Sequence, residues 1–177
     1  MVVTVDVDQG ITSLNSSAVE EMGQQLIQVA GRAGRSDGNA TVLVQSRYVS
    51  DQNLLQLKSG NYINFAKSLM EQRQATNQPP YSFEAVIRAS SPKAQSNLEM
   101  LTYAKQFIDT SKCMLIGPIP AMQSKVRGSY HHHLVIQADT RISLNKLLVH
   151  LSDSLIKDNN NISKKVRWSI NVDPIEF

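Results

Sequence analysis

The chain has 177 residues, of which 41% are hydrophobic and 19% are charged, a composition that supports a packed core and excludes global disorder. No apolar run is long enough to cross a membrane, and the single cysteine, Cys113, excludes an internal disulfide and a four-cysteine zinc site. The formal net charge of +3 identifies no partner class, and the N-terminal residues lack the pattern of a secretion signal, so we expect a cytoplasmic protein without membrane contact.

The first 58 residues predict part of an α/β unit. An alternating, valine-rich segment at residues 2–8 predicts a buried strand, and apolar residues at helical spacing predict a helix that ends near Gly31 to Gly34. Residues 39–46 predict a second strand.

A polar helical stretch is expected at about residues 51–77, where the segment NQPPYS ends it, because two prolines cannot continue a helix. We place a module boundary there. The predicted organisation is 1–58 as the C-terminal part of a first module, 59–80 as a helical linker and 81–177 as a second domain.

The second domain predicts the order β-α-β-β-α-β, which is typical of a ferredoxin-like α+β fold with both helices on one face of a four-stranded antiparallel sheet. Alternation predicts strands at residues 82–90, 113–120, 130–138 and 166–172, and apolar stripes predict helices at about 92–108 and 144–155. The other sheet face is expected to be either a docking surface or an ordinary solvated face. It would carry Glu84, Arg88, His131, His133, Gln137, Arg167, Ser169 and Asn171.

Basic residues are concentrated in this part of the chain. Residues 1–58 hold four basic and six acidic residues, whereas residues 59–177 hold fourteen and nine, which favours nucleic-acid contact in that part of the chain. On charge alone, an ordinary solvated surface is the preferred interpretation. Because the first and third strands are central in this fold, Arg88 and His131 are expected to be neighbours. The residues predicted to hold DNA phosphates are Arg88, Lys125, Arg127, His131, Lys164, Lys165 and Arg167.

The three consecutive histidines also suggest a metal site, because His131 and His133 would share one face of a strand. No carboxylate or thiol lies at ligand spacing, so we expect no metal there. The open sheet face has no aromatic pair, so base-stacking RNA recognition is not supported either.

The motif QVAGRAGR, residues 28–35, resembles the sixth motif of superfamily 2 helicases, which have two RecA-like lobes. The resemblance implies that Arg35 is an arginine finger that stabilises charge on the γ-phosphate of ATP, with Arg32 as a second catalytic contact. It also implies that Gln28, Gly31, Arg32 and Arg35 contact the nucleotide. The alternative is that these arginines only meet the dipole of a helix C-terminus.

Four segments in order resemble the family of primosomal replication-restart helicases: QQLIQVAGRAGR, NQPPYSFEAVIRAS, GPIPA and VRWSINVDPIEF. Val5 to Asp8 is similar to an Asp-Ala-Asp segment of the family's second lobe. The resemblance covers nearly the whole chain and implies the end of a RecA-like helicase lobe followed by a ferredoxin-like C-terminal domain.

The resemblance further implies an ATP-dependent 3′ to 5′ DNA helicase that recognises stalled replication forks and restarts replication by primosome assembly. Its implied partners are forked and single-stranded DNA, the single-stranded-DNA-binding protein and primosome proteins. ATP, Mg²⁺ and zinc would belong to the full-length enzyme, whose phosphate-binding loop and zinc-binding cysteines this chain lacks. We therefore expect no cofactor on this chain and no ATP hydrolysis by it alone.

Two alternatives stay open. In the first, the chain is a non-enzymatic, ferredoxin-like module that docks a protein partner. In the second, it is part of an RNA helicase, a class that shares the GRxGR pattern but does not explain the PPYS and VDP segments. DNA binding that weakens steeply with salt would separate the first alternative from the helicase hypothesis.

Overall fold

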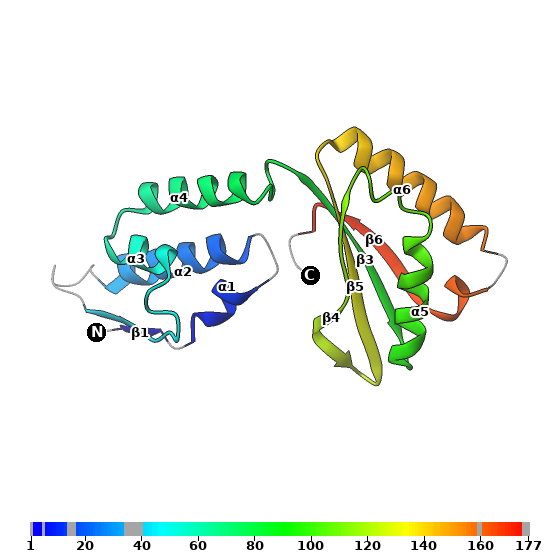
Figure 1. Cartoon of the computed structure of the whole chain (residues 1–177). Coiled ribbons are helices and arrows are strands. Elements are labelled where there is room, and N and C mark those ends of the chain that lie inside the picture. Colours follow the sequence, from blue (N-terminus) through cyan, green and yellow to red (C-terminus); the bar gives the residue numbers. More distant parts are fainter. Residues whose placement is uncertain (1, 5, 14–16, 34–40, 159–160, 175–177) are drawn as a thin grey trace. The chain divides into compact units, whose positions relative to one another are not determined.

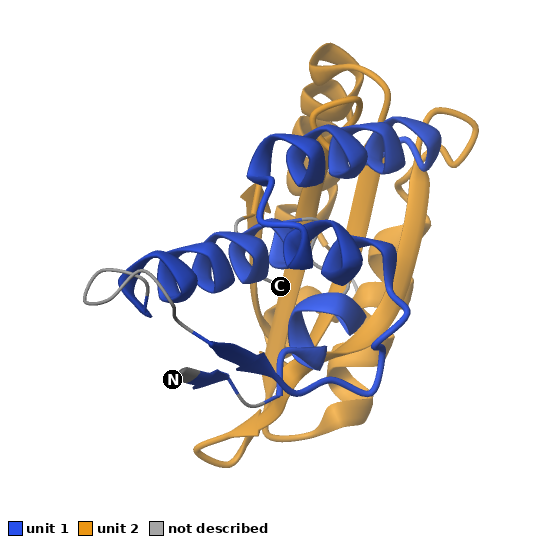
Figure 2. Cartoon of the chain, turned by 90° about the vertical axis from the view of Figure 1, so that its left-hand side faces the viewer, with its two compact units in different colours: residues 1–78 blue, residues 79–177 orange. Residues whose placement is uncertain are grey.

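The computed structural model describes residues 2–4, 6–13, 17–33, 41–158 and 161–174 (Figure 1). The chain is a mixture of helices and two separate sheets, and it divides into two compact units (Figure 2). Unit 1 comprises residues 1–78 and unit 2 comprises residues 79–177, so the division falls at the first of the paired prolines.

Within its described residues, unit 1 combines a short parallel sheet with helices. Strand β1 (Val2–Thr4) pairs with β2 (Val42–Val44), and Val3 lies opposite Leu43. The helices are α1 (Asp8–Thr12), α2 (Ala18–Ala33), α3 (Gln52–Lys58) and α4 (Tyr62–Ala75). Helix α1 occupies residues for which the sequence predicts a strand end and a polar loop.

Helices α3 and α4 replace the single helical stretch expected at residues 51–77. Gly60 has a positive φ of 72°, which interrupts the helical path. The side chain of Asn61 then accepts a hydrogen bond from the backbone N–H of Asn64 at 3.1 Å and so begins α4. The prediction was correct on helical content and wrong on continuity.

The core of unit 1 lies where α2 meets α3 and α4. Phe65 of α4 is fully buried, and a Cβ at Gly23 of α2 would lie 2.5 Å from its ring, so only glycine allows this approach. Arg73 of α4 also forms an ion pair with Glu20 of α2 at 3.1 Å. The segment 59–80, expected as a helical linker, thus contributes to a core made of Val7, Met22, Leu26, Leu57, Phe65 and Leu69.

Unit 2 contains one antiparallel sheet in the order β4-β5-β3-β6, with α5 and α6 on one of its faces (Figure 1). The chain order is β-α-β-β-α-β, as the sequence predicts. The elements are β3 (Phe83–Ser91), α5 (Ala94–Lys105), β4 (Met114–Val126), β5 (Ser129–Ala138), α6 (Arg141–Ile156), the short 3-10 helix η1 (Ser163–Lys165) and β6 (Arg167–Val172).

The core of unit 2 lies between the sheet and its two helices. Ala85, Ile87 and Ala89 of β3 are buried against α5 and α6, as their alternation predicts. Trp168 of β6 packs against the same cluster, which confirms its predicted place on the apolar face. This packing fixes which side chains of β3, β5 and β6 face away from the helices.

Strand β4 is longer than the sequence predicts. The expected strand stops at Pro120, yet β4 continues to Val126 and joins β5 through a two-residue turn at Arg127 and Gly128. Both turn residues have a positive φ, of 48° and 83°. Because β4 is an edge strand, its prolines interrupt the ladder without ending it.

Candidate functional site

Helix α2 presents three of the residues predicted to contact nucleotide in its C-terminal half. Gln28 and Arg32 are four residues apart, so they lie on one face of the helix, and both are exposed. Apart from the helix's own backbone, no heavy atom of the described residues lies within 4 Å of the position that a Cβ would take at Gly31. Arg35, the predicted arginine finger, lies outside the described residues.

Asp8, from the segment VDVD, has a structural position at the start of α1. Its carboxylate accepts hydrogen bonds from the Ser46 hydroxyl at 2.6 Å and from the backbone N–H of Arg47 at 3.1 Å. These contacts tie the beginning of α1 to the segment that follows β2. The carboxylate therefore stabilises the α/β packing of unit 1.

The sheet of unit 2 brings three of the predicted DNA-binding residues together on the face opposite to the helices. Ser90 of β3 lies between His131 of β5 and Arg167 of β6 in the strand register. Arg88 is two residues earlier on the same face, and its direct partner on β5 is His133. Arg88 and His131 thus lie on adjacent strands, one row apart instead of directly opposite.

The four other predicted residues lie at the same end of this sheet. Lys125 pairs with Tyr130 in the register, and its Nζ lies 4.9 Å from the centre of the Tyr130 ring. Arg127 is exposed in the turn that joins β4 to β5. Lys164 and Lys165 are exposed in η1, directly before β6.

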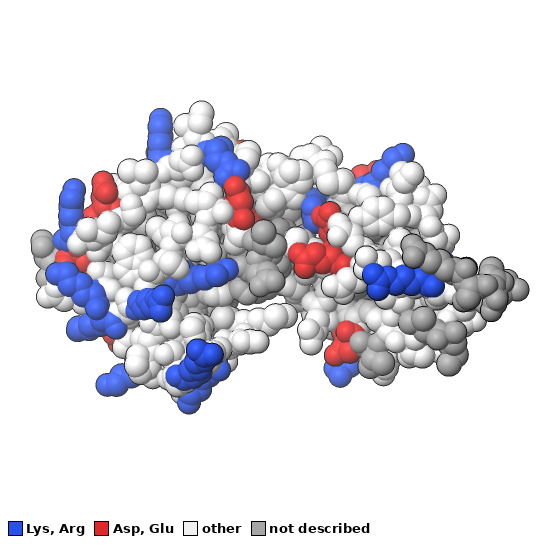
Figure 3. Space-filling model, turned by 180° about the vertical axis from the view of Figure 1, so that it is seen from behind, with Lys and Arg blue, Asp and Glu red and all other residues white. Residues whose placement is uncertain are grey.

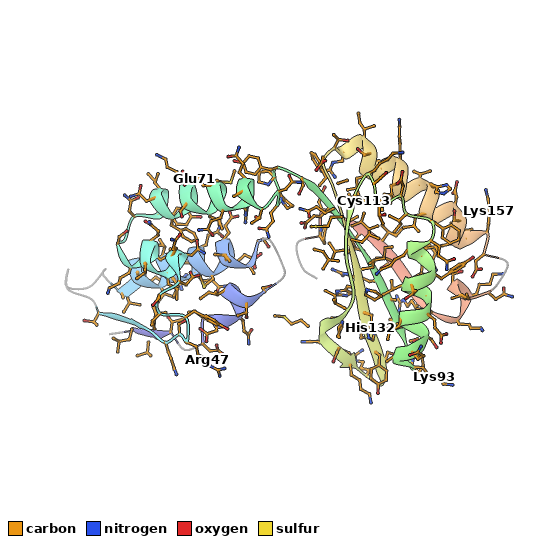
Figure 4. The ribbon with its side chains drawn as sticks, viewed as in Figure 1. Arg47, Glu71, Lys93, Cys113, His132 and Lys157 are labelled. Atoms are coloured by element: carbon orange, nitrogen blue, oxygen red, sulfur yellow. The ribbon has the colours of Figure 1, made fainter. Side chains whose placement is uncertain are left out.

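Lys93 is a residue at this end that sequence reasoning missed. It is exposed and precedes α5, two residues after Ser91, which lies opposite Tyr130 (Figure 4). Its position immediately after a predicted strand was the available signal. We call the resulting surface the cationic sheet end; it comprises Arg88, Lys93, Lys125, Arg127, His131, Lys164, Lys165 and Arg167.

Cations outnumber carboxylates around the cationic sheet end, where the buried carboxylate of Asp158 accepts a hydrogen bond from the Ser163 backbone N–H at 2.8 Å. The segments that form it, residues 85–98, 110–138 and 159–172, contain no Asp or Glu. The opposite end of the sheet holds Asp173, which pairs with Arg141 at 2.5 Å and so neutralises that cation. On the face of unit 2 seen in Figure 3, lysine and arginine outnumber aspartate and glutamate. An excess of cations on one face favours contact with a polyanion.

The adjacent histidines are held neutral by their surroundings. Burial, together with the nearby charges of Arg88, His131 and His132, lowers the pKa of His133 to about 4. Burial also lowers the pKa of His132, whose Nδ1 lies 3.3 Å from the amide nitrogen of buried Asn97. The same Asn97 amide donates to the Tyr130 carbonyl at 2.8 Å, so it anchors the start of β5 to α5.

Two structural findings bear on other classes of site. Among the described residues, no three His, Cys, Asp or Glu side chains gather in a way that would hold a metal ion. In the same part of the chain, no helix has both the length and the apolar character needed to cross a membrane.

Comparison with known proteins gives consistent matches along the chain. The chain is 32% identical to a protein of Haemophilus influenzae over 98% of its own length and 24% of the relative's length. It is 30% identical to a protein of Rickettsia felis over its whole length and 26% of the relative's length. The chain therefore spans about a quarter of the curated relatives that it matches. Among solved structures, the designed protein Foldit4 aligns with 52% of this chain at 9% identity and a TM-score of 0.40, too low to define a fold.

The fold and the site define a two-unit α+β chain with a cationic surface suited to polyanions. The chain belongs to the primosomal protein N C-terminal domain family, whose model matches residues 74–175. Both relatives described above are named replication restart protein PriA.

Proposed function

We propose that this chain acts in replication restart as the C-terminal part of an ATP-dependent 3′ to 5′ DNA helicase that recognises stalled forks. In this proposal unit 2 binds forked and single-stranded DNA through the cationic sheet end. The surface that carries this proposal is a sheet end with cations from β3, β4, β6, η1 and two connecting segments, which contain no Asp or Glu.

We also propose a ferredoxin-like arrangement for unit 2 and a RecA-like origin for unit 1. The strand order β4-β5-β3-β6 and two helices on one sheet face support the first. A parallel β1–β2 pair with α2 between the two strands in the chain supports the second.

Unit 1 would supply arginines to a nucleotide held by another segment of the full-length enzyme. Exposure of Arg32 and Gln28 on one helix face supports this role, because a cation must be accessible to reach the phosphate from across an interface. ATP, Mg²⁺ and zinc would act in the full-length enzyme. The single-stranded-DNA-binding protein and primosome proteins are the further partners proposed, and the cytoplasm is the proposed location.

The DNA-binding proposal is tested by a salt titration of the K125A/R127A/R167A variant. Each lost phosphate contact lowers the slope of log affinity against log salt by about 0.7 to 0.9, so we expect the slope to fall by about 2 to 3. The matched control, K67A/K146A/K157A, removes the same charge from exposed lysines elsewhere and should change the slope by less than about 1.

Equal losses in both triple variants would show that only net charge matters and would contradict a defined DNA-binding surface. Binding to the single-stranded-DNA-binding protein without any DNA binding at low salt would instead support the docking-module alternative.

The nucleotide proposal is tested in the full-length protein. Arg35→Ala should lower the kcat of ATP hydrolysis by about 10³-fold or more, as expected for an arginine that stabilises transition-state charge. Arg47→Ala, which removes a 92% exposed arginine side chain from the same unit, should leave kcat unchanged. Steady ATP hydrolysis by the 177-residue chain alone, abolished by Arg35→Ala, would contradict the proposal.

A further inference from the structure

Strand β4 leaves the regular ladder beside the cationic sheet end. Pro120 pairs with His132 and Lys125 pairs with Tyr130, so residues 121–124 of β4 lie opposite His131 alone. A bulge of this kind bends an edge strand and turns side chains out of the sheet. It therefore offers residues of β4 for contacts that the ladder does not make.

Met122 lies within this bulge and is 73% exposed. This exposed fraction is higher than that of any other large hydrophobic side chain among the described residues. An isolated apolar side chain on a protein surface needs no explanation by itself. The residues around Met122 indicate which kind of partner it could contact.

The surroundings of Met122 are neutral or basic. Lys125 and Arg127 follow the bulge along the chain, His131 lies opposite, and residues 110–138 contain no Asp or Glu. A nucleic-acid strand complements this pattern, because its bases present apolar faces while the phosphates on either side carry negative charge. The same pattern would repel a basic protein surface.

We propose that Met122 packs against the face of an unstacked DNA base while Lys125 and Arg127 hold the neighbouring phosphates. The inference rests on the proposed DNA binding by unit 2. Methionine suits this contact because its flexible thioether packs favourably against aromatic rings, and apolar side chains of this kind enter base steps in other DNA-binding proteins. Because every base has such a face, the contact selects unpaired DNA without selecting a sequence.

The experiment compares two single-stranded oligonucleotides of equal length, one with bases and one with abasic sites. Met122→Ala should weaken binding to the first by about fivefold or more and leave binding to the second unchanged, with the same salt slope for both. Met122→Leu should keep most of the affinity. Met114→Ala is the matched control, since Met114 lies on the same strand, is 52% exposed and lies at the other end of the sheet.

A forked substrate and a blunt duplex give the second arm. The wild-type chain should prefer the fork, and Met122→Ala should reduce that preference, because only the fork offers unstacked bases. An equal loss on normal and abasic strands, or no loss on either, overturns the contact while leaving salt-dependent DNA binding intact. If the wild-type chain binds neither DNA, the proposed DNA binding fails and the Met122 contact fails with it.

Discussion

At the scale of single residues, Gly23 shows how one missing side chain permits a core. The ring of Phe65 occupies the space in which a Cβ of residue 23 would lie. Gly23→Ala should therefore lower the free energy of unfolding of unit 1 by about 1–3 kcal/mol, the usual cost of overpacking a core. Urea unfolding followed by circular dichroism measures this loss.

Gly31 is the control within the same helix, because a Cβ there meets no side chain of the described residues within 4 Å. Gly31→Ala gains helix propensity without a clash, so stability should stay equal or rise by up to about 1 kcal/mol. A loss of similar size in both variants would show that α2 requires glycine for a reason other than the Phe65 contact.

His133 makes stability depend on pH. Its pKa of about 4 in the folded chain lies below the ordinary value of about 6.5, so the unfolded chain binds a proton first as pH falls. Stability should decrease from about pH 6.5 down to about pH 4, by at most about 3 kcal/mol. His132, whose pKa is also lowered, acts in the same direction.

The measurement is the urea midpoint as a function of pH for wild type and His133→Gln. The variant removes one of the two histidines whose pKa is lowered, so its curve should be flatter between pH 4 and pH 6.5. Parallel curves for the two chains would mean that the pKa of His133 is the same in the folded and unfolded chains and that its burial does not control the pH response.

At the scale of elements, two glycines shape the β4–β5 hairpin in different ways. Gly117 has a φ of 112°, and a Cβ there would lie 2.7 Å from the His133 carbonyl oxygen. Gly128, in the turn, has a φ of 83° and open surroundings. Replacement by alanine would therefore strain the backbone at both positions, but it would cause a steric clash only at position 117.

Gly117→Ala should cost about 3 kcal/mol or more, and Gly128→Ala about 1 kcal/mol, when unfolding of unit 2 is followed by Trp168 fluorescence. Equal costs would show that the close approach to His133 relaxes freely.

The same elements show what a sequence can and cannot predict. Alternation identified β3, β5 and β6 and the face that each residue occupies, because burial on one side of a sheet imposes a period of two. The sequence did not predict that β4 continues past Pro120, because this part contains polar residues and follows two prolines. Its pairing depends on β5 and not on an alternating pattern of its own. The cationic sheet end followed from topology, and Lys93 could have been added to it from its position immediately after a predicted strand.

The local sequence pattern also cannot predict which residue of the neighbouring strand each side chain lies opposite. Placing Arg88 next to His133 requires the register of β3 and β5, and that register depends on where the β4–β5 hairpin turns. For the same reason the bulge that exposes Met122 could not be foreseen.

At the scale of the whole molecule, two separate cores predict two separable responses to mutation. Phe65 and Leu101 are both fully buried, the first in unit 1 and the second in unit 2. Phe65→Ala should lower hydrogen-exchange protection in residues 1–78 by about 3–5 kcal/mol and leave residues 79–177 protected, while Leu101→Ala does the reverse by about 2–5 kcal/mol. Loss of protection throughout the chain in either variant would show that the units unfold together.

The separation of charge along the sheet of unit 2 has a kinetic consequence. At one end cations stand without carboxylates in the same segments, and at the other Arg141 is neutralised by Asp173. Such a polarity exerts a torque on an incoming polyelectrolyte before any atoms touch, so the first encounters are already oriented. Lower ionic strength should therefore raise the association rate constant for DNA far more than it lowers the dissociation rate constant.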